Sequence, residues 1–305
     1  ADARAGRFGL TRDMAKPEPG AGQILIVGRN SFLARRVLGV LPADRVRAVG
    51  HDAIDRPDLL DGVACIVNFA RHPLLGSEHY RPEAMDADLR LARRIGTREI
   101  AYLMLSSRKV YAPGTRPLTE TWPTGPTDAY GRAKLAAEQG VQELLGERLT
   151  VLRLANVFGY ERVAGRRTFL AQALERLALD GEIRYDMSPF VIRDFLPVAI
   201  FASLLGQIAQ APPGGILNLG SGIGLPTGRL ALWILEGFGR GSLVITSPRE
   251  HDAFVLDVSR LRRLYGAPCS LDELSRTCLE IGRRLAAELE DRERSRDLEG
   301  HSERT

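Results

Sequence analysis

The chain has 305 residues, of which 44% are hydrophobic, and a formal net charge of +4. That length is enough to bury a large core, in one large domain or in two coupled ones. Basic residues form no stripe interleaved with aromatic residues, which argues against nucleic acid as a partner. No apolar run reaches the roughly 18–20 residues that a membrane span needs, so no membrane is expected as a partner either.

The N-terminus and the cysteines bear on the location of the protein. Residues 1–22 are polar and lack the apolar stretch of a secretory signal, so we expect a flexible extension. Cys65, Cys269 and Cys278 are odd in number and widely spaced, as is typical of buried thiols in a reducing compartment. The sequence therefore predicts a cytoplasmic protein. Its five histidines have no ligand spacing, and no metal is expected.

Short apolar runs alternate with amphipathic segments in the first half of the chain. Strands are predicted at Gln23–Val27, Arg45–Val49, Ala64–Phe69, Ile100–Leu105 and Leu149–Leu154, and helices at Ser31–Leu41, Glu83–Ile95 and Ala129–Leu145. This alternation predicts an α/β fold, a Rossmann-like doubly wound parallel sheet with helices on both faces. The carboxyl ends of its strands meet at one edge, where ligands bind.

The second half of the chain mixes longer helices with a few short strands. Helices are predicted at Thr168–Leu179, Val198–Gln210, Thr227–Phe238 and Leu271–Leu289, and strands at Ile216–Leu219 and Leu243–Ile245. We expect a Rossmann domain over residues 23–160 and a smaller mixed α/β substrate lobe mainly over residues 161–290. Some segments of that lobe are expected to return to the Rossmann sheet, and residues 291–305 to form a charged tail.

The turn after the first strand has the spacing of a dinucleotide-binding loop. Gly28-x-x-Ser31-x-x-Ala34 keeps only the first of three glycines, but serine and alanine are small enough for a backbone to come close. Ser31 is expected to add a hydroxyl donor or to cap the following helix. An ordinary strand–turn–helix connection without a ligand is the alternative. The candidate cofactor contacts of this loop are Gly28, Arg29, Asn30, Ser31, Phe32 and Leu33.

The end of the second strand bears on the choice between NAD and NADP. An acid there binds the ribose hydroxyls of NAD, whereas a basic residue suits the extra phosphate of NADP. Val49 is followed by Gly50, His51 and Asp52, so no acid stands at the strand's end. Arg29 and His51 favour NADP, while Asp52 would serve NAD. Both His51 and Asp52 are candidate cofactor contacts.

Tyr130 and Lys134 give the strongest sign of chemistry. Of the 42 Lys and Arg residues, only Lys16, Lys109 and Lys134 are lysine, and Lys134 follows Tyr130 by one helical turn. Residues i and i+4 share a helix face, so the ammonium favours the phenolate and gives a hydroxyl that exchanges protons near neutral pH. A chance pair on a helix is the alternative.

Ser107 follows the fourth predicted strand, at the edge of the sheet where ligands bind. Beside Tyr130 and Lys134 it would complete a set of groups for hydride transfer at a carbonyl or alcohol carbon. In such a set the serine polarises the oxygen, the tyrosine gives or takes its proton, and nicotinamide handles the hydride. Serines are common at strand ends, and this is the alternative interpretation of Ser107.

Nine short motifs follow one another along the chain. In order they are Gly28-x-x-Ser31-x-x-Ala34, Ile66-Val-Asn-Phe-Ala70, Ser106-Ser-x-x-Val-Tyr111, Tyr130-x-x-x-Lys134, Leu152-Arg-Leu-Ala-Asn-Val-Phe-Gly159, Arg193-Asp-Phe195, Asn218-Leu-Gly-Ser-Gly222, Arg249-Glu-His-Asp252 and Asp257-Val-Ser-Arg260. Over about residues 23–266 this order resembles the extended short-chain dehydrogenase/reductase family, the NAD(P)-dependent epimerase/dehydratase group that acts on nucleotide sugars.

The resemblance implies roles around the cofactor. The serine, tyrosine and lysine described above match the catalytic triad of the family. Phe69 and Ala70 match the segment that lies along the cofactor, and Arg71 follows them where the family more often has a small residue. The asparagine that commonly stands before the fourth strand has no clear counterpart, and Met85-Asp-Ala-Asp88 stands near its place.

The resemblance also implies a site for a nucleotide-sugar substrate. Asn156 matches a residue near the phosphates of the sugar nucleotide, and Arg193 and Arg249 match arginines that bind its diphosphate. Arginine suits that role because its planar fork binds phosphate oxygens through two hydrogen bonds. Asp252 matches an acid that binds ribose hydroxyls.

Two departures from the family bear on the reaction. Arg108-Lys109 occupies the places of the Asp-Glu pair with which the sugar-nucleotide 4,6-dehydratases remove a proton and water, which argues against dehydration. The segment His51–Gly62 is short, as in the reductases that complete deoxysugars. The resemblance therefore implies an NAD(P)-dependent oxidoreductase or epimerase, acting on a sugar carbon, C4 being expected, of a nucleotide-activated sugar. A dinucleotide-binding protein without catalysis and a reductase of a non-nucleotide carbonyl are the alternatives.

The resemblance extends to assembly. The predicted helices Glu83–Ile95 and Ala129–Leu145 match the two that family members pair across a two-fold axis, so we expect a homodimer with an isologous interface. Core packing is the alternative role for the small residues on the second helix. These residues are Ala133, Ala136, Ala137 and Val141.

Overall fold

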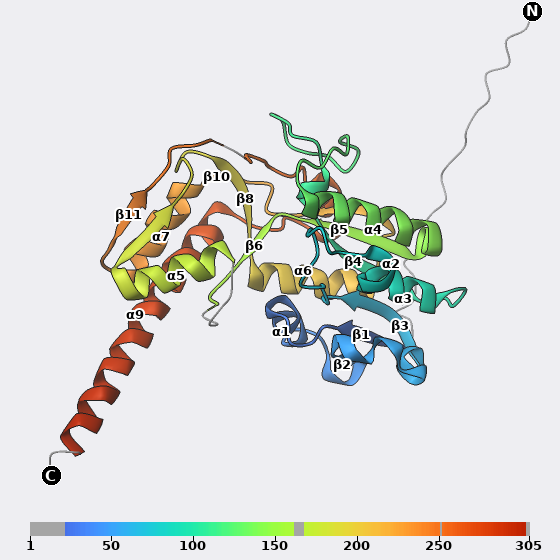
Figure 1. Ribbon diagram of the computed structural model, residues 1–305, viewed down its shortest axis with the longest axis horizontal. Coiled ribbons are helices and arrows are strands. Elements are labelled where there is room, and N and C mark those ends of the chain that lie inside the picture. Colours follow the sequence, from blue (N-terminus) through green and yellow to red (C-terminus); the bar gives the residue numbers. More distant parts are fainter. Residues whose placement is uncertain (1–21, 162–167, 251, 303–305) are drawn as a thin grey trace, which may run out of the picture.

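A six-stranded sheet organises the larger part of the molecule (Figure 1). The structure is a computed structural model that describes residues 22–161, 168–250 and 252–302, so most of the predicted N-terminal extension lies outside the described residues. The strands lie in the order β2 (Val46–Val49), β1 (Gln23–Val27), β3 (Val63–Asn68), β4 (Ala101–Ser107), β5 (Leu149–Leu154) and β9 (Gly215–Leu219). Each pairs in parallel with its neighbours, which confirms the predicted doubly wound parallel sheet.

Helices cover both faces of this sheet because its strands send apolar side chains alternately to the two sides. One face is covered by α1 (Phe32–Leu38) and α6 (Val198–Gln210), the other by α3 (Ala87–Ile95) and α4 (Ala129–Leu145). On β1, Ile26 packs toward the first pair of helices and its neighbour Leu25 toward the second, and both are fully buried. The sheet is therefore the middle of three layers, and its carboxyl edge is open to a ligand.

Two predicted helices differ from those observed, and capping explains both differences. Glu83–Ile95 was expected as one helix, but it is broken into α2 (Pro82–Met85) and α3 at Asp86, whose extended backbone lets its side chain accept from Leu89 N at 3.0 Å. Asp86 is thus an N-cap instead of a helical residue. The first helix ends at Leu38 and not at Leu41, since Gly39 disfavours the helix and Pro42 keeps the residue before it extended.

The second lobe is built on two small sheets (Figure 1). One has the order β10 (Gly224–Pro226), β8 (Ile192–Pro197) and β6 (Asn156–Phe158), and the other pairs β7 (Glu182–Tyr185) with β11 (Ser242–Ile245). The helices α5 (Phe169–Asp180), α7 (Thr227–Phe238) and α9 (Leu271–Ser302) enclose a separate apolar core, and α8 (Ser259–Tyr265) lies beside β9. β6 directly follows β5 in the chain, so the polypeptide passes from one lobe to the other at the carboxyl edge of the large sheet.

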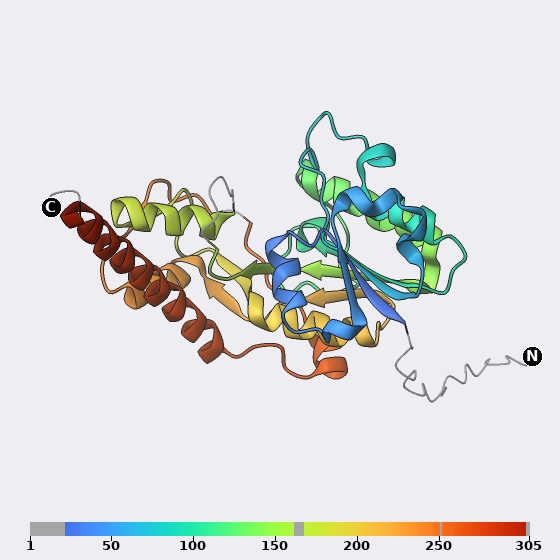
Figure 2. The ribbon, with the colours of Figure 1, turned by 90° about the horizontal axis from the view of Figure 1, so that it is seen from below.

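The last helix is longer than the sequence pattern predicted. Leu274, Cys278, Ile281 and Leu285 recur at helical spacing and are buried in the core of the second lobe. The apolar pattern fades at the predicted end, Leu289, yet α9 continues to Ser302 and projects away from the body in Figure 1; Figure 2 shows the same helix from below. Salt bridges between residues four apart, such as Glu288 with Arg292, stabilise a helix that has no core to cover.

Several smaller expectations can be compared with the structure. Ala137 and Val141 are buried against the large sheet, so core packing is their role, whereas Ala136 is exposed. Cys65 and Cys278 are buried thiols, and the described cysteines form no disulfide. Within the described residues, no helix combines the length and the apolar character needed to cross a membrane.

Candidate active site

Three adjoining cavities follow the carboxyl edge of the large sheet. The first, here called the β2-side cavity, lies between the turn after β1 and the end of β2 and has a volume of about 430 Å³. The second, the central groove, has about 660 Å³ and runs over the ends of β3 and β4. The third, the lobe cavity, has about 370 Å³ and lies between the large sheet and the second lobe. Neighbouring cavities share lining residues, so together they form one extended site.

Tyr130 stands where the central groove meets the lobe cavity and lines both. It is in the first turn of α4, whose N-cap Asp128 accepts from Gly131 N at 2.7 Å and binds Lys109 Nζ at 2.5 Å. Burial raises the pKa of Asp128, but the bonds to Lys109 and Gly131 outweigh it and hold that pKa below its usual range. The start of α4 is thereby fixed to the turn Arg108–Val110, which follows β4. This attachment places the tyrosine over the end of the sheet.

Lys134 follows one turn later and lines the central groove beside Tyr130. Its side chain is only 9% exposed. Its Nζ donates to Leu105 O at 3.0 Å and lies 3.6 Å from Oδ2 of Asp88. Burial lowers the pKa of Lys134, but Asp88 and Tyr130 outweigh burial and raise it, so the amine is charged at neutral pH.

Two serines at the end of β4 have different roles. Ser106 is buried and donates its hydroxyl to Glu138, which also forms a buried ion pair with Arg153 at 2.6 Å. Ser107 is half-buried, and its oxygen accepts from Lys109 N at 3.2 Å. That contact leaves the hydroxyl hydrogen of Ser107 for a ligand. Both serines line the lobe cavity with Tyr130.

The turn after β1 is tight and requires glycine at its first position. Gly28 has a φ of +85°, and a Cβ on it would lie 2.6 Å from Ala70 N, so only glycine fits here. Ser31 caps α1 by accepting from Ala34 N at 3.3 Å, one of its two expected roles. Gly28, Asn30, Ser31, His51, Phe69, Ala70 and Arg71 line the β2-side cavity. Phe32 and Leu33 line the lobe cavity instead, whereas Arg29 and Asp52 are exposed and outside the lining.

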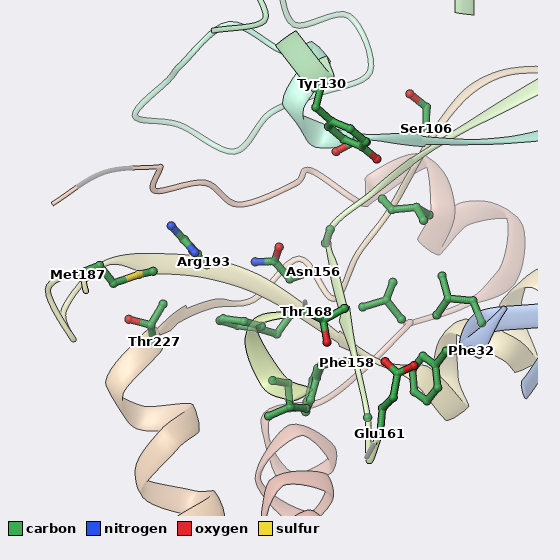
Figure 3. A pocket seen from close by; sticks show the side chains of 18 residues that line it. Phe32, Ser106, Tyr130, Asn156, Phe158, Glu161, Thr168, Met187, Arg193 and Thr227 are labelled. Atoms are coloured by element: carbon green, nitrogen blue, oxygen red, sulfur yellow. The ribbon is translucent and has the colours of Figure 1, made fainter. Parts of the chain in front are cut away.

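The second lobe supplies the other wall of the lobe cavity (Figure 3). Tyr130 and Ser106 enter it from the side of the large sheet, whereas Arg193 and Thr227 lie across from them, with Asn156 in between. Asn156 begins β6 and Arg193 lies on β8, two strands that pair in parallel. The two residues expected near substrate phosphates thus reach one cavity with the tyrosine.

Asp252 is bound to two arginines. Both terminal nitrogens of Arg108 donate to its carboxylate, and Arg193 lies 3.5 Å from Oδ2. Burial raises the pKa of Asp252, but Arg108 and Arg193 outweigh it and lower that pKa below its usual range. Asp252 also has a φ of +65°, which is uncommon outside glycine.

Arg249 does not join the other candidate substrate contacts. Its side chain is exposed, and it is absent from the lining of the three described cavities. Its backbone oxygen accepts from Ser188 N at 2.8 Å, which attaches this segment to the loop before β8. The neighbouring residue 251 lies outside the described residues.

The sequence reasoning missed several cavity residues. Thr227 lines the lobe cavity, but it begins a helix whose only marked pattern is apolar, so no signal set it apart. Glu161 follows the recognised Gly159 by two positions and is buried at the same cavity. Asp88 drew attention only because it stands near the place of the family's asparagine. Its contact with Lys134 joins two helices, and no short motif in the sequence marks such a contact.

In the described ranges, no group of three or more His, Cys, Asp and Glu side chains is placed to hold a metal ion.

Solved structures with this fold include enzymes of nucleotide-sugar chemistry. MoeE5, solved with UDP-glucose and NAD, is 21% identical with a TM-score of 0.69 over 86% of this chain and 99% of its own. UDP-glucose 4-epimerase of Thermus thermophilus, solved with NAD, is 17% identical with a TM-score of 0.69 over 86% of this chain and 99% of its own. RMD of Pseudomonas aeruginosa, solved with NADPH, is 20% identical with a TM-score of 0.70 over 87% of this chain and 99% of its own. These likenesses establish the fold.

Family membership comes from the sequence. No curated protein matches the chain. The profile of the NAD dependent epimerase/dehydratase family, however, matches residues 24–220, which is more than half of the chain and includes Ser107, Tyr130, Lys134 and Arg193. The resemblance inferred from the nine motifs is thereby confirmed. This protein belongs to the NAD dependent epimerase/dehydratase family, a group of extended short-chain dehydrogenases/reductases.

Proposed function

We propose that this protein is an NAD(P)-dependent enzyme that reduces or epimerises a sugar carbon, C4 being expected, of a nucleotide-activated sugar. The observation that carries the proposal is the position of Tyr130, which lines both the central groove and the lobe cavity. A cofactor in the first and a substrate in the second would meet at its hydroxyl. The charged Lys134 beside it supports proton transfer there.

The residues present fit a dinucleotide in the β2-side cavity and the central groove. Gly28 allows the tight turn after β1 that the first glycine of a dinucleotide-binding loop provides, and Arg71 adds a positive charge beside both cavities. When bound, nicotinamide supplies or accepts the hydride. At the substrate, Ser107 donates its hydroxyl to the reacting oxygen and Tyr130 gives or takes the proton of that oxygen. The charged ammonium of Lys134 lines the same groove and stabilises negative charge that develops on the tyrosine oxygen during proton transfer.

Reduction or epimerisation is favoured over dehydration. Arg108 and Lys109 occupy the positions of the two acids that the dehydratases use. Arg108 forms an ion pair with Asp252, and Lys109 forms one with Asp128. Cations at these two positions cannot remove a proton from carbon. A ketoreductase must exchange its cofactor in each turnover, whereas an epimerase keeps it and returns the hydride.

For the cofactor we propose NADP over NAD. His51, Arg71 and Arg90 line the β2-side cavity, and Asp52 lies outside its lining. A basic lining suits the extra phosphate of NADP, whereas an acid would suit the ribose hydroxyls of NAD. Thermal shifts measured with NAD and NADP at equal concentration test this choice, and a larger shift with NAD would overturn it.

For the substrate we propose contacts from the second lobe. Asn156 and Arg193 line the lobe cavity, and Arg249 and Asp252 complete the set that would hold a diphosphate and a ribose. MoeE5, which has this fold, was solved with UDP-glucose and with UDP-glucuronic acid. Thermal shifts with UDP-, dTDP- and GDP-sugars test the proposal directly, since a ligand at 100 times its Kd stabilises by about 2.7 kcal/mol.

A reductase of a non-nucleotide carbonyl is the second candidate. Two observations favour it: Arg193 is already bound to Asp252, and Arg249 is exposed. Binding of NADP together with a lack of response to every nucleotide sugar would support this candidate against the first.

We further propose that the protein is a homodimer and acts in the cytoplasm. Ala136 and Leu144 are exposed on α4 and offer an apolar surface for a second copy. Light scattering at micromolar concentration tests the dimer, and a monomeric mass would refute it.

A further inference from the structure

A buried carboxylate, that of Asp88, lies next to Lys134 and outside the lining of the central groove. Asp88 is the second residue of α3 and is 3% exposed. Its Oδ2 is 3.6 Å from Nζ of Lys134. Lys134 and Tyr130 line the central groove, whereas Asp88 is absent from the lining of that groove and of the lobe cavity. Asp88 can therefore act on the reaction only through the groove residues that it contacts, Lys134 and Asn68.

The other oxygen of Asp88 fixes the carboxylate in one orientation. Oδ1 accepts from the hydroxyl of Tyr102 at 2.7 Å and from Nδ2 of Asn68 at 2.7 Å. Tyr102 is fully buried in β4, and Asn68, at the end of β3, also accepts from Ala70 N at 2.9 Å. The carboxylate is thus bound to two neighbouring strands of the sheet, and its Oδ2 is directed to the lysine.

Charged and titratable groups face Lys134 from every element packed against it. They are Asp86 and Asp88 at the start of α3, Arg71 after β3, and Tyr130 on α4 itself. Tyr102 on β4 contacts Asp88, and Glu138 lies one turn further along α4. Among them Asp88 forms the ion pair with Lys134, at 3.6 Å, whereas Glu138 is bound to Arg153 and Asp86 to Tyr80. Burial and the neighbouring Asp86 raise the pKa of Asp88 above its usual value, while Lys134, Asn68 and Tyr102 act against that rise.

We propose that Asp88 is a positioning residue that holds the ammonium of Lys134 charged and in place beside Tyr130. A buried lysine without an opposite charge releases its proton at lower pH, since burial disfavours the charged form. The pairing itself does not depend on the reaction. Only its catalytic consequence rests on the proposed function.

The scarcity of lysine makes the pairing directly measurable. The chain has three lysines, Lys16, Lys109 and Lys134, so ¹³C labelling of the lysine carbon next to the amine gives three resonances for NMR. The variants Lys16→Arg and Lys109→Arg assign them. In Asp88→Asn, we expect the titration of Lys134 to move down by about one to three pH units, the usual effect of removing a neighbouring opposite charge.

Asp86→Asn is the matched control. Asp86 is the other carboxylate that acts on Lys134, but it binds Tyr80 and caps α3. Asparagine caps a helix equally well, so the substitution keeps the cap. We expect a clearly smaller shift of Lys134 in this variant. An unmoved Lys134 in Asp88→Asn, or an equal shift in both variants, would overturn the proposal.

Asp88→Asn leaves a buried ammonium without its partner, so the variant can fail to fold. The double variant Asp88→Asn/Lys134→Met covers that case, because it removes both charges. We expect it to melt at a higher temperature than Asp88→Asn alone. No gain in the double variant would show that the two side chains do not act as a pair.

The catalytic consequence is a change in the pH profile. We expect kcat to fall at high pH as Lys134 loses its proton. In Asp88→Asn this fall should occur at the lower pH at which Lys134 then titrates, and in the wild type at a higher pH. A shifted Lys134 with an unchanged profile would overturn the link to catalysis. Failure of the proposed function would look different: the wild type would not turn over nucleotide sugars, while the NMR titration would still report on the pairing.

Discussion

Arg108 and Asp252, which stand 144 positions apart in the chain, bind each other through two hydrogen bonds across the two lobes. Arg108 follows β4 of the large sheet, and Asp252 belongs to the segment after β11. Arg108 also packs on the ring of Phe254, with 4.1 Å between its guanidinium carbon and the ring centre. Because Arg193 shares the same carboxylate, Asp252 links Arg108 to Arg193, the arginine that lines the lobe cavity.

This arrangement predicts how stability depends on pH. The folded pKa of Asp252 lies below its usual value, so its contribution to stability is present above the unfolded pKa of about 3.9 and is lost as pH falls through the folded value. Melting temperatures of the wild type and Asp252→Asn should therefore differ by a constant amount above about pH 5 and converge below about pH 4. A difference that persists in acid would show that the charge of Asp252 is not what stabilises the fold.

Tyr130→Phe tests the chemistry. Phenylalanine keeps the ring and removes the hydroxyl, so fold and cofactor affinity should be retained while kcat falls by at least about 10²-fold, the usual effect of a positioned acid–base group. Steady-state kinetics with the best-binding nucleotide sugar provide the measurement, and thermal shift with the cofactor provides the control. Unchanged turnover would remove Tyr130 from the mechanism.

Gly28→Ala tests the dinucleotide loop. A Cβ here would lie 2.6 Å from Ala70 N, and the φ of +85° disfavours any other residue by about 1–2 kcal/mol. We expect a lower melting temperature and weaker binding of NAD(P), measured by calorimetry. Gly39→Ala is the control, because Gly39 has an ordinary φ of −73° and its nearest contact would be at 3.5 Å. Equal effects of the two substitutions would argue against a special role for Gly28.

The buried ion pair of Glu138 and Arg153 predicts a large loss of stability. Their side chains are 6% and 3% exposed, so Glu138→Gln leaves a buried guanidinium without its opposite charge. Such a loss typically costs about 3–5 kcal/mol in the free energy of unfolding. Glu143→Gln, at an exposed position of the same helix, should change it by no more than about 0.5 kcal/mol. Urea denaturation of both variants measures the difference.

The elements that the sequence predicted best are those with a strong internal pattern. The strand Gln23–Val27 and the helices Ala129–Leu145 and Val198–Gln210 were predicted to the residue, because continuous apolar runs and a clear helical period mark them. The break at Asp86 was missed, since a capping side chain inside a helical pattern looks like any other polar residue. The charged end of α9 was missed because it has no apolar face.

In the candidate site, too, residues with a local sequence pattern could be predicted and contacts between distant segments could not. Ser107, Tyr130 and Asn156 carry local motifs, and the structure brings all three to the lobe cavity. The partners that bind the site residues come from distant segments: Asp88 approaches Lys134 from another helix, and Asp252 approaches Arg108 from the other lobe. No spacing along the chain encodes such contacts, so the sequence alone could not predict them.

Arg249→Ala tests the substrate class. Arg249 is exposed, so removing it should not affect folding, and its role would lie in binding a diphosphate. We expect a higher KM for a nucleotide sugar, by about 1.5–3 kcal/mol for each charged hydrogen bond lost, with NAD(P) affinity almost unchanged. Arg249→Lys should restore part of the effect, because lysine keeps the charge but lacks the planar fork. If Arg249→Ala leaves nucleotide-sugar binding as it was, Arg249 does not bind the diphosphate. With no other basic residue assigned to the phosphates except Arg193, which Asp252 already holds, the reductase of a non-nucleotide carbonyl then becomes the better assignment.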